Sequence, residues 1–507
     1  MASNSTSPTT SISVPVALRR WLPLVLLIGL AIGAWQASEA ADTDEANEVP
    51  VAYENELGTP LLSARRIPET LQAPIADDAV LPAIEEFVAG LRVAQPDLQT
   101  CLIVEVDGRE LVNEGANLAL IPASNQKLVT TYAALEVLPA DTRFTTRVSR
   151  SGEITDGVLD GDLYFVGGGD PFLVTDAWRA QYVVRDDAGE VVPDAYPRAW
   201  TRLEDLADQI AATGITSISG SIVADESLFD TVRTGPWAER LILQNQSGPL
   251  SALAVNEGFV DWGDTNPAFS LRTIAPDPAV QAADVLRQLL SDRGIVVTGT
   301  ATGTEPPGTV DVGAVESAPL IDVITHINSW SNNFGAEILL KHIGLTIGGE
   351  GSTAAGAAAV RTILERNPDF DLQGIVIEDG SGLAETNLLT CALLNSLLVA
   401  SGIDSPLAQS LSIGGERGSL AFRHVDTEAD GNVFAKTGTL NPSTALSGFV
   451  VSADEPGTFV TFSYISNAEI VQNGVADGQE PFIEELTEYP EAPPADALDP
   501  LDPIPLN

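Results

Sequence analysis

The sequence predicts an α/β fold: one domain assembled from both ends of the chain body, interrupted by a long, mostly-β insertion of one or two domains. Segments with apolar residues at helical spacing alternate with strand-like runs over residues 71–147, and the same alternation is found again after residue 318. Between these parts, residues 148–317 consist of short β-like runs separated by Gly, Pro and Asp. A chain of 507 residues also exceeds one ordinary core, so two or three domains are expected.

The first predicted elements are a helix, a strand pair and a second helix. Residues 81–91 carry apolar side chains at helical spacing, with Pro82 where a first helical turn tolerates proline. Residues 102–106 and 110–112 flank an Asp-Gly pair and predict a β-hairpin. A helix is expected over residues 124–138, ended by the proline that follows. This order of elements favours a sheet with helices packed on it.

The later elements repeat this alternation. In the insertion, the β-like runs cover residues 163–166, 217–223, 269–274 and 294–299. After it, helical patterns cover residues 320–343, 352–365 and 390–400, and two apolar strands cover residues 445–451 and 458–465. The simplest architecture joins the elements from both ends of the body in one domain.

Both termini lie outside this body. Two arginines precede 15 apolar residues at 21–35, a run shorter than the about 20 residues of a bilayer span. Residues 1–40 are therefore interpreted as an export signal, with an uncleaved signal anchor as the alternative. Residues 41–70 are interpreted as an acidic linker and residues 489–507 as an acidic, Pro-rich tail. Either reading of the N-terminus places the body outside the cytoplasm, in the periplasmic or cell-wall space, with that anchor as the one expected membrane contact.

Composition argues against several kinds of partner. The formal net charge is −46, from 25 Lys and Arg against 71 Asp and Glu, whereas nucleic acids and anionic membranes require clustered cations. Cys101 and Cys391 can form at most one bridge, and the sequence leaves open whether they pair or stay free. Two cysteines and three scattered histidines show no metal-ligand spacing, so we expect neither a metal nor a cofactor.

A Ser-x-x-Lys motif, Ser124 to Lys127, is the first candidate for chemistry. Residues three apart lie on one face of a helix, so the serine hydroxyl would face the lysine amine. Such an amine can take the hydroxyl proton if burial or a neighbouring positive charge lowers its pKa. Short motifs of this kind occur by chance, but this chain has only three lysines, at positions 127, 341 and 436.

Two more motifs supply polar groups at predicted element ends. Lys436-Thr437-Gly438-Thr439 follows apolar residues and indicates an edge strand that could receive an extended peptide, the alternative being a surface lysine beside a turn. Ser331-Asn-Asn333 precedes a helical run, and offers either a hydroxyl and a carboxamide to a cleft or merely an N-cap. The segment 379–383, Asp-Gly-Ser-Gly-Leu, is no nucleophile elbow and is interpreted as a tight turn lining a site.

In this chain order, Ser-x-x-Lys, Ser-x-Asn and Lys-Thr-Gly resemble the signature of the serine penicillin-binding protein and β-lactamase superfamily. The long gap between the first two motifs is similar to that of D-alanyl-D-alanine carboxypeptidases/endopeptidases of the penicillin-binding protein 4 type. Segments 167–171, 250–256 and 379–383 resemble that family too, so the likeness spans nearly the whole body. It implies a β-lactamase/transpeptidase-like catalytic domain, an antiparallel sheet with helices on it, from residues 71–147 plus 318–488.

The resemblance implies a serine-type D-Ala-D-Ala carboxypeptidase that acts on peptidoglycan stem peptides and is acylated by β-lactam antibiotics, with endopeptidase activity left open. The implied roles are the following: Ser124 as nucleophile, Lys127 as general base, Ser331 and Lys436 as proton relay, Asn333 as ligand of the substrate amide, and Thr437, Gly438 and Thr439 as the carboxylate-binding strand. Backbone N–H groups of Ser124 and Thr439 would form the oxyanion hole. The alternatives are a serine β-lactamase or esterase on the same fold and a catalytically silent cell-wall-binding scaffold.

One departure from the family pattern concerns specificity. The family turn usually continues Ser-Arg, whereas this chain has Ala384-Glu385. An acid there would repel a free carboxylate on the diamino-acid side chain of the substrate. Asp225 falls where relatives place an acid that meets the amine of that side chain, so the resemblance implies a role for it in substrate binding.

Overall fold

The computed structural model describes residues 68–489, apart from residues 107, 183, 186–190, 193–197, 263–271 and 453–458. The expected export segment, most of the acidic linker and nearly all of the acidic tail fall outside these residues. Within the described part of the chain, every helix is too short or too polar to cross a bilayer.

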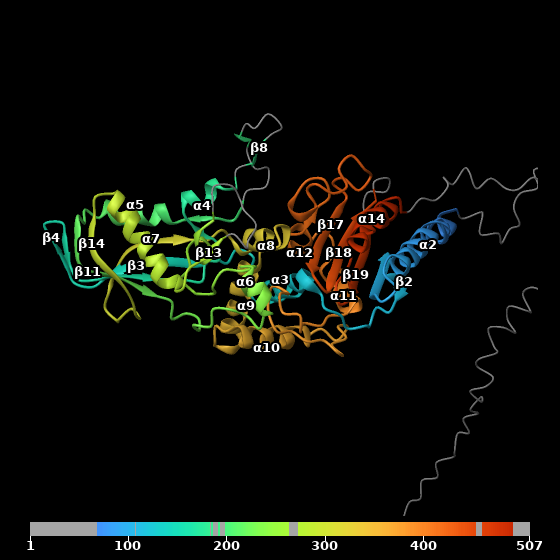
Figure 1. Cartoon of the computed structure of the whole chain (residues 1–507), viewed down its shortest axis with the longest axis horizontal. Helices are drawn as coiled ribbons and strands as arrows, with labels where there is room; N and C mark the ends of the chain where they lie inside the picture. Colours follow the sequence, from blue (N-terminus) through green and yellow to red (C-terminus); the bar gives the residue numbers. More distant parts are fainter. Residues whose placement is uncertain are drawn as a thin grey trace, which may run out of the picture. The chain divides into compact units, whose positions relative to one another are not determined.

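A six-stranded antiparallel sheet combines strands from both ends of the body, as the sequence predicts (Figure 1). The strand order is β16-β17-β18-β19-β1-β2, so that N-terminal β1 pairs with C-terminal β19. The predicted hairpin is β1 and β2, and the two apolar strands are β18 and β19. The bounds are β1 Gln99–Val106, β2 Arg109–Glu114, β16 Ser412–Ile413, β17 Val433–Leu440, β18 Ser443–Val451 and β19 Phe459–Asn467.

Helices cover both faces of this sheet, which explains why its central strands are buried along almost their whole length. On one face, Leu102 and Val104 pack against α2 (Pro68–Ala94) and α14 (Gln479–Thr487). On the other, Cys101 and Ile103 face the larger cluster that includes α3, α8, α9, α10 and α11. These helices are α3 Gln126–Val137, α8 Leu320–Ser329, α9 Asn333–Gly348, α10 Thr353–Leu364 and α11 Cys391–Ser401.

The helical pattern predicted over residues 320–343 is two helices, α8 and α9, rather than one. Ser331 has a left-handed backbone with φ of 54°, which stops α8. Asn332 then starts α9, because its Oδ1 accepts a hydrogen bond of 2.6 Å from the Gly335 N–H. The break places the Ser-x-Asn motif at the start of α9, as the sequence predicts, with Asn332 as the N-cap.

The insertion is a mixed sheet of order β15-β3-β6-β11-β5-β4, with β14 also paired to β11 (Figure 1). Three predicted runs there fall in strands β6, β11 and β14, whereas the helices α5 and α7 that cover the sheet were not singled out from the sequence. Because β11 runs parallel to β6 and β14, helical crossovers are needed to join them. The bounds are β3 Thr145–Arg150, β4 Glu153–Thr155, β5 Val158–Asp160, β6 Leu163–Val166, α5 Leu203–Ala212, β11 Ser217–Asp225, α7 Pro278–Asp292, β14 Val296–Thr302 and β15 Val310–Glu316.

Shorter elements connect these parts. They are η2 Ala123–Asn125, β7 Leu173–Val174, α4 Asp176–Ala180, β8 Val184–Arg185, β9 Val191–Val192, β10 Thr201–Arg202, α6 Glu239–Leu243, η3 Asn256–Gly258, β12 Phe259–Asp261, β13 Thr273–Ile274, α12 Pro406–Gln409, η5 Gly418–Leu420 and α13 Asn473–Asp477.

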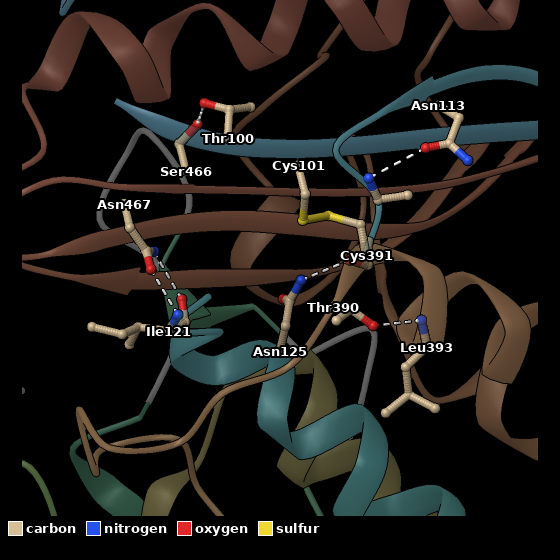
Figure 2. The surroundings of a disulfide bond; sticks show 12 residues. Thr100, Cys101, Asn113, Ile121, Asn125, Thr390, Cys391, Leu393, Ser466 and Asn467 are labelled. Atoms are coloured by element: carbon tan, nitrogen blue, oxygen red, sulfur yellow. Dashed lines mark hydrogen bonds between the residues drawn. A yellow bond between two sulfur atoms is a disulfide. The ribbon is translucent and has the colours of Figure 1, made fainter. Parts of the chain in front are cut away.

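The two cysteines, whose pairing the sequence left open, form a disulfide. Cys101 in β1 and Cys391 at the start of α11 are bonded, 290 residues apart along the chain, and both are fully buried (Figure 2). The bond joins the sheet to a covering helix across the whole insertion. It therefore closes a long loop in the unfolded chain and reduces the conformational entropy of that state.

We predict that breaking this bond destabilises the protein by about 2–5 kcal/mol, the range typical for loss of a native disulfide. Thermal unfolding with and without a reductant should show a lower midpoint for the reduced wild type. The double variant Cys101→Ala, Cys391→Ala should have a lowered midpoint that does not respond to reductant. Equal midpoints for the wild type under both conditions would contradict a stabilising role for the bond.

Candidate active site

The segment that carries Ser124 is fixed to the end of the central sheet. The Asn467 side chain at the end of β19 holds both backbone groups of Ile121: Oδ1 accepts from the Ile121 N–H at 2.7 Å, and Nδ2 donates to the Ile121 carbonyl at 3.0 Å (Figure 2). Ser443 donates to the same carbonyl at 2.6 Å. Ala123, with a left-handed φ of 47°, then turns the chain so that the half-buried Ser124 precedes α3.

Lys127 lies one turn after Ser124 and is surrounded by three oxygens. Its Nζ is 3.0 Å from Ser124 Oγ, 2.7 Å from Asn333 Oδ1 and 2.6 Å from the Ser381 carbonyl. An uncharged amine has two N–H groups and one lone pair. Asn333 and Ser381 can accept from the two N–H groups, which leaves the lone pair free to accept the Ser124 proton.

Lys436 forms the second half of the cluster. It lies in β17, is fully buried, and places Nζ 2.9 Å from Ser331 Oγ and 2.8 Å from the Thr437 carbonyl. The left-handed backbone at Ser331 is the kind of local strain that persists where surrounding structure holds it. The structure therefore pairs a hydroxyl with a buried amine twice, once at Ser124 and once at Ser331.

The Lys-Thr-Gly strand leaves part of its edge uncovered. Strand β16 pairs only with Phe434 and Ala435, so among the described strands none covers that edge of β17 from Lys436 onward. Gly438 allows close approach, since a Cβ there would lie 2.9 Å from the Pro122 carbonyl oxygen. Thr437 Oγ1 is 2.7 Å from Ser419 Oγ. An extended peptide could add to this free edge beside Ser124.

Burial is the main influence on the pKa of both the Lys127 and the Lys436 amine. It lowers the pKa of Lys127 to about 7, although the acids Asp379 and Glu337 partly oppose the shift. Burial also lowers the pKa of Lys436 well below its ordinary value, and repulsion from Lys127 adds to this. Desolvation therefore lowers the pKa of each amine more than repulsion between the two lysines does, and Lys127 can lose its proton near neutral pH.

The Asp-Gly-Ser-Gly-Leu segment is a tight turn, as predicted. Its Asp379 carboxylate accepts hydrogen bonds from the Trp237 indole, the Asn387 amide and two backbone N–H groups of the turn and the residue after it. Gly382 has φ of 84°, and a Cβ at this position would collide with the Ala123 carbonyl oxygen. The turn therefore packs directly on the segment that carries Ser124.

Two groups from the insertion hold the Ser-x-Asn motif, and neither was found from the sequence. The Gln246 carbonyl accepts from Asn333 Nδ2 at 2.7 Å, and the buried Glu257 accepts from Asn332 Nδ2 at 3.0 Å. A backbone carbonyl leaves no trace in residue identity, so Gln246 had no signal. Glu257 directly follows the family-like segment 250–256, which was its one available signal.

Asp225 and Glu385, the two residues that the sequence analysis connects with substrate specificity, have contacts away from Ser124. The buried Asp225 at the end of β11 accepts from the backbone N–H groups of Ser227 and Glu305, so the contacts seen for it lie in the insertion and not at Ser124. Its role in substrate binding stays a prediction. Glu385 forms an ion pair with Arg240 of α6. Among the described residues, no group of three or more His, Cys, Asp or Glu is arranged to hold a metal ion.

Comparisons with known proteins agree with these observations. The family model described as the D-Ala-D-Ala carboxypeptidase 3 (S13) family matches residues 91–268 and 263–487. A D-alanyl-D-alanine carboxypeptidase of Actinomadura sp. (strain R39) is 33% identical over 454 residues, which cover 77% of this chain and 80% of that protein. A carboxypeptidase of Mycobacterium tuberculosis is 29% identical over 418 residues, covering 79% and 84%.

The fold is also similar to a solved structure. The crystal structure of penicillin binding protein 4 from Haemophilus influenzae matches with a TM-score of 0.65 and 20% sequence identity. The match covers 79% of this chain and 99% of that chain. The likeness therefore extends over the catalytic sheet and the insertion together.

We predict that Lys127 titrates near pH 7, below the ordinary value of about 10.4 for lysine. Protein labelled with 13C at the lysine Cε should give three signals, because the chain has three lysines. Lys127→Arg and Lys436→Arg assign two of them. The Lys127 signal should report a charged amine below pH 7 and a free amine above it. A midpoint near 10 for Lys127 would contradict its capacity to act as a base.

Proposed function

The chain belongs to the D-Ala-D-Ala carboxypeptidase 3 (S13) family, and from this we propose how it acts as a serine-type D-Ala-D-Ala carboxypeptidase. It is a peptidase, so the alternative of a catalytically silent scaffold is set aside. One observation carries the proposal: the fully buried Lys127 amine lies 3.0 Å from Ser124 Oγ. The substrate is the stem peptide of peptidoglycan that ends in D-Ala-D-Ala.

Acylation begins when the free amine of Lys127 takes the proton of Ser124. The Ser124 oxygen then attacks the carbonyl carbon between the two D-Ala residues, and the backbone N–H groups of Ser124 and Thr439 receive the oxyanion. Asn333 binds the substrate amide while it holds Lys127 in place. The geometry supports these roles because donor and acceptor are already within hydrogen-bond distance before substrate binds.

Departure of the terminal D-Ala requires a proton on its nitrogen. Ser331 and Lys436, 2.9 Å apart, form the relay that delivers it. The substrate lies along the free edge of β17, where Thr437, Gly438 and Thr439 bind the terminal carboxylate and the buried Lys436 attracts its charge. Water then hydrolyses the acyl-enzyme. A peptide cross-link can follow the same steps, which gives an endopeptidase activity as well.

The reaction takes place outside the cytoplasm, where peptidoglycan lies. The Cys101–Cys391 disulfide supports this location, since such bonds persist in oxidising compartments and are rare in the cytosol. The expected export signal or anchor at residues 1–40 would bring the chain there.

We predict that a fluorescent penicillin labels the wild type at Ser124, mapped by mass spectrometry of the adduct. Ser124→Ala should not be labelled, and Lys127→Arg should be labelled at least about 10³-fold more slowly, because arginine stays protonated. Lys341→Arg is the matched control, since it is the one lysine outside the motifs. Wild type that is folded but not labelled would overturn the proposal. Rapid loss of the label would point to a β-lactamase instead.

Specificity for the diamino-acid side chain gives a further prediction. Because Arg240 pairs with Glu385, their charges offset each other, and the wild type should treat free and amidated side chains alike within several-fold. Arg240→Ala leaves Glu385 unpaired, so kcat/KM should shift toward the amidated peptide. A ratio that Arg240→Ala does not change would show that Glu385 is not near the substrate side chain.

A further inference from the structure

Glu337 is a fully buried acid that the proposed reaction does not use. It lies on α9 four residues after Asn333, so the two side chains occupy one face of the helix. Acidic side chains are almost never fully buried unless their oxygens are bound by partners. The partners of Glu337 therefore indicate what the helix holds at this point.

Its Oε1 has two partners, both backbone groups of the tight turn, whereas the described residues give Oε2 no hydrogen bond. Glu337 Oε1 accepts from the Gly380 N–H at 3.1 Å and from the Ser381 N–H at 2.8 Å. The carbonyl of that same Ser381 accepts from Lys127 Nζ at 2.6 Å. A continuous path of hydrogen bonds thus runs from Glu337 through one residue of the turn to the Lys127 amine.

Helix α9 therefore holds Lys127 by two routes. Asn333 contacts the amine directly, and Glu337 contacts it through Ser381. We propose that Glu337 is a positioning residue for acylation: by accepting from the turn, it fixes the Ser381 carbonyl, and this carbonyl holds the Lys127 amine at Ser124. The inference rests on the proposed function, because it assigns Glu337 a part in that reaction.

The electrostatics of the cluster fit a role that depends on hydrogen bonding rather than on charge. Burial and the neighbouring Asp379 raise the pKa of Glu337 to about 8, although Ser381 and Lys127 oppose the shift. A neutral carboxyl group still accepts through its carbonyl oxygen. The titratable groups that face Lys127 are Glu337 on α9, Asp379 on the turn and Lys436 on β17; an ionised Glu337 opposes the low pKa of Lys127, whereas a neutral Glu337 does not.

The test compares two substitutions of similar size. Glu337→Gln keeps a carbonyl acceptor for the turn, whereas Glu337→Met fills the same space without one. Stopped-flow labelling with a fluorescent penicillin separates the acylation rate constant from the affinity of the first complex. Glu337→Gln should stay near the wild-type rate, and Glu337→Met should lower the rate constant by about 10²-fold, the usual result of misplacing a catalytic group by about 1 Å. The affinity should not change, because β17 binds the ligand.

Controls separate positioning from a loss of folding. Glu378→Met changes the exposed acid beside the same turn and should leave both constants unchanged. Gly380→Ala acts from the other side, because its Cβ would lie 2.6 Å from the Ala336 carbonyl oxygen and would displace the turn from α9. Acylation should also be slower in this variant. If circular dichroism shows that Glu337→Met is unfolded, the acylation rate of Gly380→Ala tests the proposal in its place.

Two results would overturn the inference. Folded Glu337→Met or Gly380→Ala that is acylated at the wild-type rate would show that the turn needs no such support. Glu337→Gln as slow as Glu337→Met would show that the charge matters instead of the hydrogen bonds. Absence of Ser124 labelling in the wild type would instead reject the proposed function itself.

Discussion

The site depends on one interaction. The Lys127 amine is buried at hydrogen-bond distance from the Ser124 hydroxyl, without a carboxylate in direct contact. In water the Lys127 amine would hold its proton, whereas in the protein interior the loss of hydration lowers its pKa to about 7. Ordinary hydrogen-bond acceptors, Asn333 and the Ser381 carbonyl, occupy the positions that a carboxylate would take in an ion pair. Direct contact with a carboxylate would favour the ammonium form and remove the base.

Keeping such an amine in place requires segments that are far apart in the chain. The central sheet supplies Asn467, which holds the chain before Ser124, and the disulfide joins β1 of this sheet to α11. The insertion supplies the Gln246 carbonyl and Glu257, which hold the junction between α8 and α9. The insertion is thus part of the catalytic structure, because two of its residues fix the Ser-x-Asn motif.

The three motifs could be recognised from residue identity and spacing. The same information was enough to predict the hairpin and the assembly of one domain from both ends of the chain body. It could not predict the Ser381 and Gln246 carbonyls, since every residue has a carbonyl and only the fold directs it. The start of a helix after Ser331-Asn-Asn333 could be predicted, whereas the left-handed backbone at Ser331, which separates α8 from α9, depends on tertiary packing and could not. The cysteine pairing required the distance between β1 and α11.

The positions of the three lysines have a physical explanation in the structure. All three lysines are fully buried, whereas the ion pairs on the outside of the described chain are made mainly by arginine. Arginine does not lose its proton in proteins, so it cannot replace Lys127 or Lys436. Lys341, on the same helix as Asn333, instead pairs with Asp230 and donates to the Val232 carbonyl, which compensates its burial. The same residue type is thus ionic where a carboxylate contacts it and a candidate base where only neutral oxygens do.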